Sequence, residues 1–427
     1  MACSIYYVYG YRLFIQLDHV GVVPIQRNAR LFSELSTSLC HIMIDRDKIA
    51  LTVRQMESKE DLLSLLNQLK QEEMRDAGMS DKFHPFTMKL LNYYCNPNNT
   101  FHRYKQFNIK KKSGGMRQIT APRNASFMLM LRYVNEVFMA IYTPSEYAMG
   151  FAEGRSVVTN ASMHKGQNYV FNIDLKDFFP SIAQARVWKR LQLEPLCLKR
   201  PIANLLAGLC AMRVETVGGG AKYILPQGAP TSPVLTNMIC DTLDRRLSGL
   251  ARRFGLRYTR YADDITFSSM HNVYQESGEF RQELKRIIEG QGFTINEAKT
   301  RLQKLGARQE VTGIIVSDKL NVTQKYVRDI RNLLYIWGEY GYGVAADRFL
   351  TKYLREKGDV KKGNPNMVNV LSGKLMYLKM VKGDADSVYL RLKSKFDRLV
   401  EKLTKPSRRS GEVDIDELND DLDKLLS

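Results

Sequence analysis

Two neighbouring carboxylates, Asp263 and Asp264, lie in the segment Tyr261-Ala-Asp-Asp between two β-prone stretches. Neighbouring carboxylates repel each other unless a cation offsets their charge, and in-line phosphoryl transfer uses such ligands to hold two divalent ions about 4 Å apart. A third carboxylate is then expected from another strand, and Asp174 lies near the end of the β-prone run 169–175. A plain turn between strands, where Asp is common, is the alternative. Together the three acids favour a site for metal-assisted phosphoryl transfer.

The segment 225–233, Leu-Pro-Gln-Gly-Ala-Pro-Thr-Ser-Pro, has three prolines and a glycine in nine residues and leads into a long helical pattern. One interpretation is a helix-capping turn, with Thr231 or Ser232 at the N-cap and Pro233 in the first turn. A rigid loop would also allow backbone amides and Gln227 to line a nucleotide pocket. The two interpretations are compatible, and we keep both.

Strand patterns alternate with helical patterns around these motifs, which predicts an α+β fold. Ser113-Gly-Gly between two short segments indicates a hairpin turn. Four leucines share one face of a helical stretch within 31–76, namely Leu62, Leu65, Leu66 and Leu69. Further helices are expected at 126–142, from Pro180-Ser181 onward, at 231–254 and at 327–337, 367–381 and 388–403, with strands at 169–175, 256–261 and 265–268.

The composition of the chain points to a folded protein with a polyanionic partner. It has 427 residues, 44% of them apolar, which excludes a chain that is as a whole a disordered tail or a small disulfide-linked domain. Lys and Arg total 64 against 45 Asp and Glu, a formal charge of +19 that predicts binding to a polyanion. The six cysteines lack Cys-x-x-Cys spacing, so neither a zinc ribbon nor a redox motif is expected. No apolar run approaches the roughly 20 residues of a membrane span, and no basic segment precedes the apolar N-terminus, so we expect a cytoplasmic protein.

Four segments occur in order: Asp174-Leu-Lys-Asp-Phe-Phe, Gln227-Gly-Ala-Pro-Thr-Ser-Pro, Tyr261-Ala-Asp-Asp and Gly292-Phe-Thr-Ile-Asn-Glu-Ala-Lys-Thr. Together they resemble the successive palm motifs of reverse transcriptases, and 109–119 resembles the fingers motif that precedes them. Asn160-Ala-Ser-Met-His is similar to the Asn-Ala-x-x-His signature of bacterial retron reverse transcriptases, and Val311-Thr-Gly is similar to their Val-Thr-Gly signature. Defence-associated bacterial reverse transcriptases share much of this pattern and remain an alternative.

The resemblance implies a right-hand polymerase with fingers, a palm built from an antiparallel sheet with helices, and a helical thumb. On this basis we expect a largely helical N-terminal extension at 1–95, fingers and palm at 96–310, a thumb at 311–405 and an acidic tail at 406–427. The tail is expected to be disordered, because the last 18 residues hold seven acids and one Lys.

The resemblance also implies that Asp174, Asp263 and Asp264 hold two Mg²⁺ ions, with the backbone carbonyl of Leu175 as a further ligand. Oxygen ligands suit octahedral Mg²⁺, and no His or Cys lies in these motifs to favour zinc. One ion would lower the pKa of the primer 3′-hydroxyl, and the other would neutralise the triphosphate.

Six residues are implied to bind the incoming nucleotide. Phe179 would be an aromatic gate that crowds a ribose 2′-hydroxyl, although a core aromatic is the alternative. Lys299 would protonate pyrophosphate, although an exposed lysine is the alternative. Lys112 and Arg117 would pair with the triphosphate unless the hairpin is merely solvated. Gln227 would contact the nucleotide, and Gly228 would let the backbone approach it closely.

RNA binding is implied for the two signatures and for basic residues of the C-terminal helices. Asn160 and His164 would contact the cognate RNA or, alternatively, brace their own motif, and no nucleophile accompanies His164 to suggest catalysis. Basic and aromatic groups on one helix suit a nucleic-acid duplex, although amphipathicity explains most of that pattern. The remaining predicted RNA-binding residues are Val311, Thr312, Gly313, Lys325, Arg328 and Arg331.

The predicted function is an RNA-directed DNA polymerase that uses deoxynucleotides and Mg²⁺ to copy its own structured non-coding RNA in antiphage defence. The resemblance implies priming from an RNA 2′-hydroxyl, and any effector protein is expected to be a separate chain because no nuclease motif is recognisable. A defence-associated or group II intron-like reverse transcriptase is one alternative, and no Cys- or His-rich endonuclease segment follows the thumb to support the intron type. An RNA-binding scaffold with a decayed polymerase fold is the other, which the intact acidic triad argues against.

Overall fold

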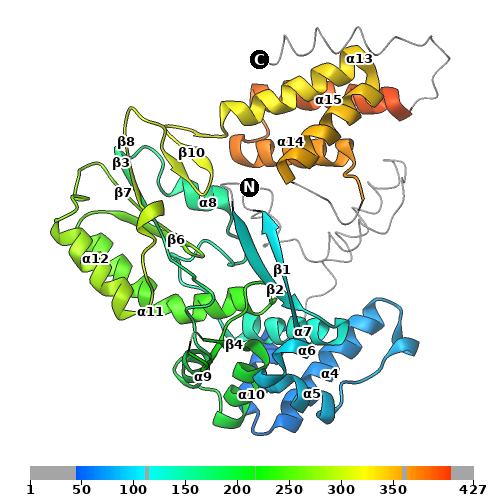
Figure 1. Cartoon of the computed structure of the whole chain (residues 1–427), viewed down its shortest axis with the longest axis vertical. Helices are drawn as coiled ribbons and strands as arrows, with labels where there is room; N and C mark the ends of the chain where they lie inside the picture. Colours follow the sequence, from blue (N-terminus) through cyan, green and yellow to red (C-terminus); the bar gives the residue numbers. More distant parts are fainter. Residues whose placement is uncertain (1–44, 111–114, 217, 358–362, 405–427) are drawn as a thin grey trace. The chain divides into compact units, whose positions relative to one another are not determined.

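The computed structural model describes residues 45–110, 115–216, 218–357 and 363–404 (Figure 1). The predicted acidic tail and the segment 1–44 lie outside the described residues. The chain forms two compact units that divide at Gln324, apart from short pieces of the later chain that belong with the first unit. Within the described residues, all strands belong to the first unit, and the second unit is helical.

The first unit begins with the helices α3 (Arg46–Gln55), α4 (Lys59–Asp76) and α5 (Met88–Cys95), with a short 3₁₀ turn, η1 (Ser80–Lys82), before α5. Helix α4 starts at a capping box, in which the side chains of Ser58 and Asp61 each accept from the other's backbone N–H. The four leucines predicted to share a face are all buried. The helical prediction is therefore confirmed from α3 onward, with a break between α3 and α4.

A two-stranded antiparallel hairpin follows η2 (Pro97–Asn99) and α6 (Thr100–Arg103). Its strands are β1 (Tyr104–Lys110) and β2 (Met116–Pro122), paired along their whole length. The predicted hairpin is confirmed, and its turn, 111–114, lies outside the described residues. Helix α7 (Ala125–Ile141) confirms the helix predicted at 126–142.

A four-stranded antiparallel sheet, in the order β6-β7-β3-β8, carries the acidic motifs (Figure 1). The predicted strands around the motifs are confirmed, and so is the long helix after the proline-rich loop. Phe280 of the following helix packs edge-on against Phe171 and Phe267 of the sheet, with ring centroids 6.3 and 5.2 Å away. These elements are β3 (Tyr169–Asp174), α11 (Ser232–Arg253), β6 (Arg257–Tyr261), β7 (Asp264–Ser269), α12 (Glu279–Gly290) and β8 (Arg301–Lys304).

Shorter elements complete the first unit. They are α8 (Val157–Ser162), α9 (Gln184–Gln192), α10 (Arg200–Cys210), β4 (Met212–Glu215), β5 (Ala221–Ile224), η3 (Glu297–Lys299), β9 (Glu310–Val311), β10 (Ile314–Val316) and β11 (Leu320–Asn321). The last three strands form a small sheet in a region expected to be helical from 311 onward, and the helices begin only at Gln324.

The predicted helix start at Pro180-Ser181 is wrong. Asp177 adopts the left-handed region with φ +47°, and the backbone N–H of Ser181 donates to the Asp177 carbonyl at 2.8 Å. Helix α9 begins only at Gln184. Pro180 therefore lies in a turn, where its fixed φ is as suitable as it is at a helix start.

The second unit, within the described residues, consists of α13 (Gln324–Lys357), α14 (Met367–Lys382) and α15 (Ser387–Thr404). These confirm the three helices predicted beyond residue 320. Helix α13 is interrupted at Gly341, whose φ of +86° is a conformation that favours glycine. Trp337 packs edge-on against Phe396 of α15, with ring centroids 6.1 Å apart.

Helices and antiparallel sheets are mixed along the chain, which confirms the predicted α+β class. In the part of the chain that the structure describes, no helix combines the length and the apolar character of a membrane span. We keep the division into fingers, palm and thumb as a proposal.

Candidate active site

The end of β3 and the turn between β6 and β7 bring the three predicted carboxylates together. Asp174 lies directly opposite Asp264 in the β3–β7 pairing, and residues so placed have Cβ atoms about 4.5–5.5 Å apart. The backbone N–H of Leu175 donates to the carbonyl of Asp263 at 3.0 Å. Ala262, with φ +57°, makes the sharp turn that precedes both acids. The acids of two strands therefore converge at one end of the sheet.

The converging carboxylates disfavour one another's charge. Burial and the charge of Asp174 raise the pKa of Asp263, partly offset by its backbone hydrogen bond and by the positive charges of Lys299 and Arg117. Asp264 retains exposed surface, but the protein around its carboxyl desolvates this group, and the charges of Asp263 and Asp174 also disfavour its ionised form. Together these effects raise the pKa of Asp264 to about 7. A cation would favour the charged forms.

Asp174 is held by two residues of the last predicted motif. Lys299 donates to both carboxylate oxygens, at 2.9 and 2.8 Å, and Asn296 Nδ2 donates to Oδ1 at 3.0 Å. The backbone N–H of Asn296 also donates to the Asp174 carbonyl at 2.8 Å. The Lys299 side chain is 58% exposed, whereas that of Asp174 is 11% exposed. Lys299 is therefore neither a free surface lysine nor fixed in the interior.

The donor chemistry of this site fits Mg²⁺, since the converging side chains offer carboxylate oxygens alone. A divalent cation would also offset the repulsion that raises the pKa values of Asp263 and Asp264. Among the described residues, no three His, Cys, Asp or Glu side chains are already arranged as a metal cage. The ammonium of Lys299 occupies both oxygens of Asp174. A metal ion at Asp174 would therefore compete with the Lys299 ammonium for these oxygens.

Arg117 lies within electrostatic reach of the carboxylates. It is exposed on β2, opposite Ile109 of β1. Its charge lowers the pKa of Asp263 against the larger effect of burial. A guanidinium in this position suits the binding of a triphosphate. Lys112 lies outside the described residues.

The proline-rich loop packs against the hairpin. The backbone N–H of Thr120 in β2 donates to the carbonyl of Gln227 at 2.9 Å. Gly228 has φ +132°, and a Cβ at this position would lie 2.8 Å from the carbonyl oxygen of Thr120. The close backbone approach that Gly228 permits is therefore with β2, a neighbour that the sequence does not predict. Thr231 occupies the N-cap position of α11, with Pro233 in the first turn, as predicted, but the Thr231 side chain makes no capping hydrogen bond.

Phe178 and Phe179 differ in their surroundings. Phe178 is buried against Phe293, with ring centroids 5.6 Å apart. Phe179 is half-buried, and its ring centroid lies 5.5 Å from that of Phe178 and 6.3 Å from that of Phe151. The core interpretation therefore applies to Phe178, whereas the ring of Phe179 retains an accessible edge.

The signature residues Asn160 and His164 are buried, with 1% and 0% of their surface exposed. His164 joins two strands, because Nδ1 lies 2.7 Å from Ser268 Oγ and Nε2 lies 2.7 Å from Thr259 Oγ1. The Thr259 hydroxyl donates to Asn160 Oδ1 at 2.6 Å, so it accepts from Nε2 of His164, and Nδ1 accepts from Ser268. Burial, with a smaller effect from the charge of Arg257, lowers the pKa of His164 to about 3.

The burial of Asn160 and His164 argues against the predicted RNA contact, because neither side chain has surface to offer an RNA. The alternative role, bracing, agrees with the contacts. Asn160 Nδ2 also donates to Thr312 Oγ1 at 3.4 Å. Val311 is buried, and Thr312 and Gly313, with φ +47° and +82°, form a half-buried turn. The two signatures therefore belong to one buried cluster.

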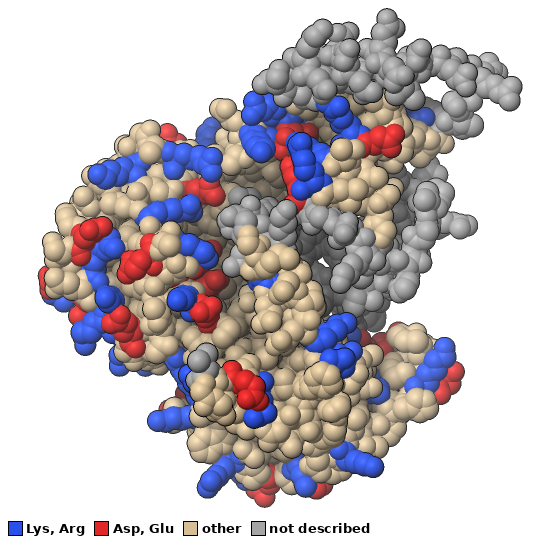
Figure 2. Space-filling view, in the orientation of Figure 1, with Lys and Arg blue, Asp and Glu red and all other residues tan. Residues whose placement is uncertain are grey.

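The basic residues predicted to bind RNA in the second unit are exposed. Lys325, Arg328 and Arg331 lie at three-residue spacing on α13, and Tyr335, 43% exposed, follows one turn later. Figure 2 shows Lys and Arg side chains over the helices of this unit, with acidic side chains among them. Such a surface can bind phosphates and stack on bases.

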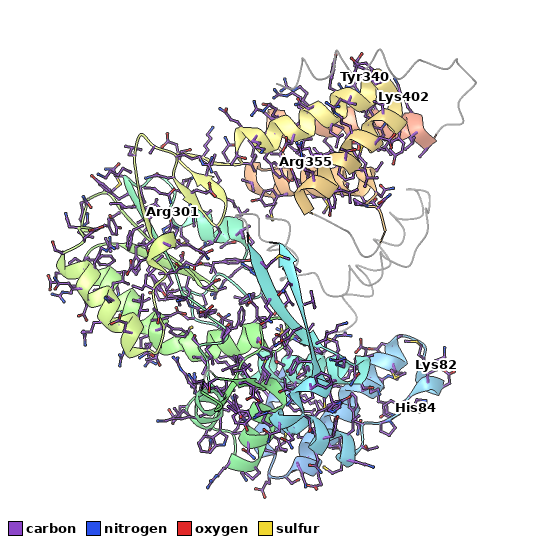
Figure 3. The ribbon with its side chains drawn as sticks, in the orientation of Figure 1. Lys82, His84, Arg301, Tyr340, Arg355 and Lys402 are labelled. Atoms are coloured by element: carbon purple, nitrogen blue, oxygen red, sulfur yellow. The ribbon has the colours of Figure 1, made fainter. Side chains whose placement is uncertain are left out.

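Two charged groups near the carboxylates do not follow from the motifs. Arg301, at the start of β8 (Figure 3), lies close enough for its charge to counter the raised pKa of Asp264. Arg260 directly precedes the acidic turn and forms a fully buried, bidentate ion pair with Asp244 of α11, with two N···O distances of 2.7 Å. The sequence holds one signal for this pair, because Asp244 interrupts the apolar face of an amphipathic helix.

Known proteins that are similar in sequence to this chain are reverse transcriptases, in agreement with the three converging carboxylates. The family described as reverse transcriptase (RNA-dependent DNA polymerase) matches residues 109–325. Retron Mx65 reverse transcriptase of Myxococcus xanthus is 38% identical over 257 residues, 58% of this chain and 59% of that protein. Retron Ec86 reverse transcriptase of Escherichia coli is 32% identical over 262 residues, 60% of this chain and 76% of that protein. The chain therefore belongs to the reverse transcriptases and, among them, to the retron type.

The chain spans 59% of the length of the Mx65 protein. Among solved structures, telomerase from Candida albicans with a TWJ fragment of telomeric RNA matches with a TM-score of 0.37 and 12% identity, over 83% of this chain and 79% of that chain.

Proposed function

We propose that this chain is an RNA-directed DNA polymerase that joins deoxynucleotides by two-metal nucleotidyl transfer. The convergence of Asp174, Asp263 and Asp264 carries the proposal, because crowded carboxylates of this kind suit a divalent-cation site. The primer hydroxyl would lose its proton to water as its oxygen bonds to the α-phosphorus, and the bond from that phosphorus to the bridging oxygen would break so that pyrophosphate leaves. Mg²⁺, when bound, would lower the pKa of the hydroxyl and neutralise the leaving group.

Other side chains would bind and select the nucleotide. Arg117, together with Lys112, would pair with the triphosphate. Lys299 would supply a proton to pyrophosphate once its ion pair with Asp174 opens. Gln227 and Gly228 would line the pocket, and Phe179 would crowd a ribose 2′-hydroxyl. The carbonyl of Leu175 would add a metal ligand.

We assign the parts of the fold accordingly. The β1–β2 hairpin would belong to the fingers, the four-stranded sheet to the palm, and the second unit to the thumb. A helical extension, 1–95, would precede the fingers. The thumb would hold the template–product duplex through Lys325, Arg328 and Arg331, whose exposure supports this role.

The retron relatives support a more specific proposal for the template. The chain would copy its own structured non-coding RNA, with priming from an RNA 2′-hydroxyl, and it would act in antiphage defence with an effector on a separate chain. The formal charge of +19 supports a nucleic-acid partner. These substrates are found in the bacterial cytoplasm, where we expect the protein to act.

The test is Asp263→Asn together with Asp264→Asn, assayed for deoxynucleotide incorporation on an annealed RNA template and DNA primer. Incorporation should be abolished while folding and RNA binding are kept, because the change removes ligand charge but little volume. The matched control, Asp76→Asn with Asp81→Asn, changes two exposed acids on and after α4 and should keep full activity. Undiminished incorporation by the Asp263 and Asp264 variant would refute the polymerase proposal.

A further inference from the structure

Two turns of the first unit pack backbone against backbone beside the carboxylates. Phe151 and Ala262 both adopt the left-handed region, with φ of +58° and +57°, which is uncommon for residues other than glycine. A Cβ added to Gly150 would lie 2.8 Å from the backbone nitrogen of Ala262. No side chain fits between the two turns, so the position of one turn fixes the position of the other.

A buried polar network holds both turns. Asn237 of α11 donates through Nδ2 to the carbonyls of Gly150 and Phe151, at 3.0 and 3.3 Å. Arg260 donates to Asn237 Oδ1 at 3.1 Å and to the carbonyl of Ala262 at 3.3 Å. Asn237 and Arg260 are fully buried, and the bidentate ion pair with Asp244 fixes the guanidinium. Asn237 therefore bonds to the Phe151 turn, and Arg260, which bonds to Asn237, also bonds to the acidic turn.

The ring of Phe151 carries this constraint to Phe179. Their centroids are 6.3 Å apart with an interplanar angle of 51°. On another side, Phe179 contacts Phe178, which is fixed in the core against Phe293. Phe179 thus has one neighbour anchored in the core and one anchored, through its backbone, to the acidic turn.

We propose that Phe151 is a positioning residue for sugar selection, which holds the Phe179 ring in register with the carboxylates. This inference rests on the proposed function, and it adds a second aromatic residue and a buried tether, Asn237, to the single gate. Without Phe151, the Phe179 ring loses an aromatic contact and is free to rotate. A ribose 2′-hydroxyl would then be excluded less strictly, although Phe179 itself is unchanged.

The test compares kcat/KM for deoxynucleotides and ribonucleotides on one annealed RNA template and DNA primer. Phe151→Ala should raise the ribonucleotide share by roughly tenfold, as expected when a pocket loses steric definition. Phe179→Ala should raise it at least as much. The double variant should match Phe179→Ala alone, because Phe151 acts only through the Phe179 ring. The matched control is Phe83→Ala, which removes another half-buried ring from a part of the sequence distant from the palm motifs. It should leave the ratio of ribonucleotide to deoxynucleotide incorporation unchanged.

A second variant tests the tether without removing a ring. Asn237→Asp keeps the shape of the side chain but removes the N–H donors to the two carbonyls, so it should shift the sugar ratio in the same direction as Phe151→Ala. An unchanged ratio in Phe151→Ala, or a double variant whose change equals the product of the single changes, would overturn the inference. Activity of the Asp263 and Asp264 double variant would instead overturn the proposed function, so the two failures are distinct.

Discussion

Strand β6 separates two buried polar clusters, one built on an ion pair and the other on hydrogen bonds between uncharged side chains. On one face, Arg260 pairs with Asp244, whose carboxylate also accepts from Tyr258 at 2.7 Å, and we call this the ionic cluster. On the other face, Thr259 joins the buried signature residues, and we call this the neutral cluster (Asn160, His164, Thr259 and Ser268). Successive residues of a strand point to opposite faces, so three consecutive residues serve both clusters.

The two clusters solve the problem of buried polarity differently. The ionic cluster buries a full charge, which is tolerated because both partners are present and hydrogen-bonded. The neutral cluster admits no charge, since burial lowers the pKa of His164 to about 3. The first lies against the acidic turn, and the second ties α8 to the sheet. The ionic cluster should therefore fail when one partner is removed, and the neutral cluster should fail when it is protonated.

The largest expected effect is on the ionic cluster. Asp244→Asn leaves the buried guanidinium of Arg260 without a counter-charge, which should cost about 3–5 kcal/mol of the free energy of unfolding. Urea denaturation measures this loss. Glu279→Gln, which breaks an exposed ion pair with Arg253, is the control and should change stability little. Equal stability of the Asp244 variant and the wild type would show that the pair is not needed to neutralise Arg260.

A smaller effect for each buried group is expected in the neutral cluster. Asn160→Ala with His164→Ala leaves the hydroxyls of Thr259 and Ser268 without these partners, at a cost of about 1–3 kcal/mol for each buried group left unsatisfied. Because the cluster braces the sheet, DNA synthesis on the protein's own RNA and on a generic primer–template should fall by the same factor. Both substrates are assayed at one salt concentration. If DNA synthesis fell only on the protein's own RNA, Asn160 and His164 would have a role in RNA recognition.

The smallest effect is the pH dependence of the neutral cluster. The pKa of His164 is lowered from its ordinary value of 6.5 to about 3, so the unfolded chain binds this proton more readily than the folded protein. Its contribution to stability is complete above pH 6.5 and declines toward pH 3, by about 1.4 kcal/mol per pH unit. Urea unfolding of the wild type and of His164→Asn, at about pH 7 and about pH 5.5, should show the steeper decline for the wild type. If the free energy of unfolding fell equally in the wild type and in His164→Asn, the folded protein would tolerate a protonated His164.

Local patterns predict the elements of this protein well. The leucine spacing of α4 and the two short segments on either side of Ser-Gly-Gly depend on neighbours in the sequence, and they correspond to an observed helix and to the observed strands β1 and β2. The acidic turn is also local, but its pairing with Asp174 joins strands that are far apart in the sequence, and the resemblance to palm motifs is what predicts it. Pro180 is the exception, because its fixed φ suits a turn as well as a helix start, and the chain beyond Asp177 adopts the turn.

What the sequence does not predict are the partners that come from distant segments. His164 is predicted to face RNA, but strands some hundred residues later cover it. Gly228 is assigned to a nucleotide, whereas Thr120 of the hairpin requires the glycine. The Asp244–Arg260 pair is visible only as an acid on an apolar helix face. In each case, the residue type indicates a constraint, and only the tertiary fold identifies what imposes it.

The pairing of Asp174 with Asp264 also limits how this chain can change over evolutionary time. Strand β3 lies between β7 and β8, so a residue inserted or deleted between Phe171 and Asp174 would turn the Asp174 carboxylate to the opposite face of the sheet. The exposed stretch 275–277 carries no such requirement. The length of the stretch 275–277 can therefore change without moving a carboxylate, whereas the number of residues within β3 is constrained by the geometry of the site as strictly as the acid itself.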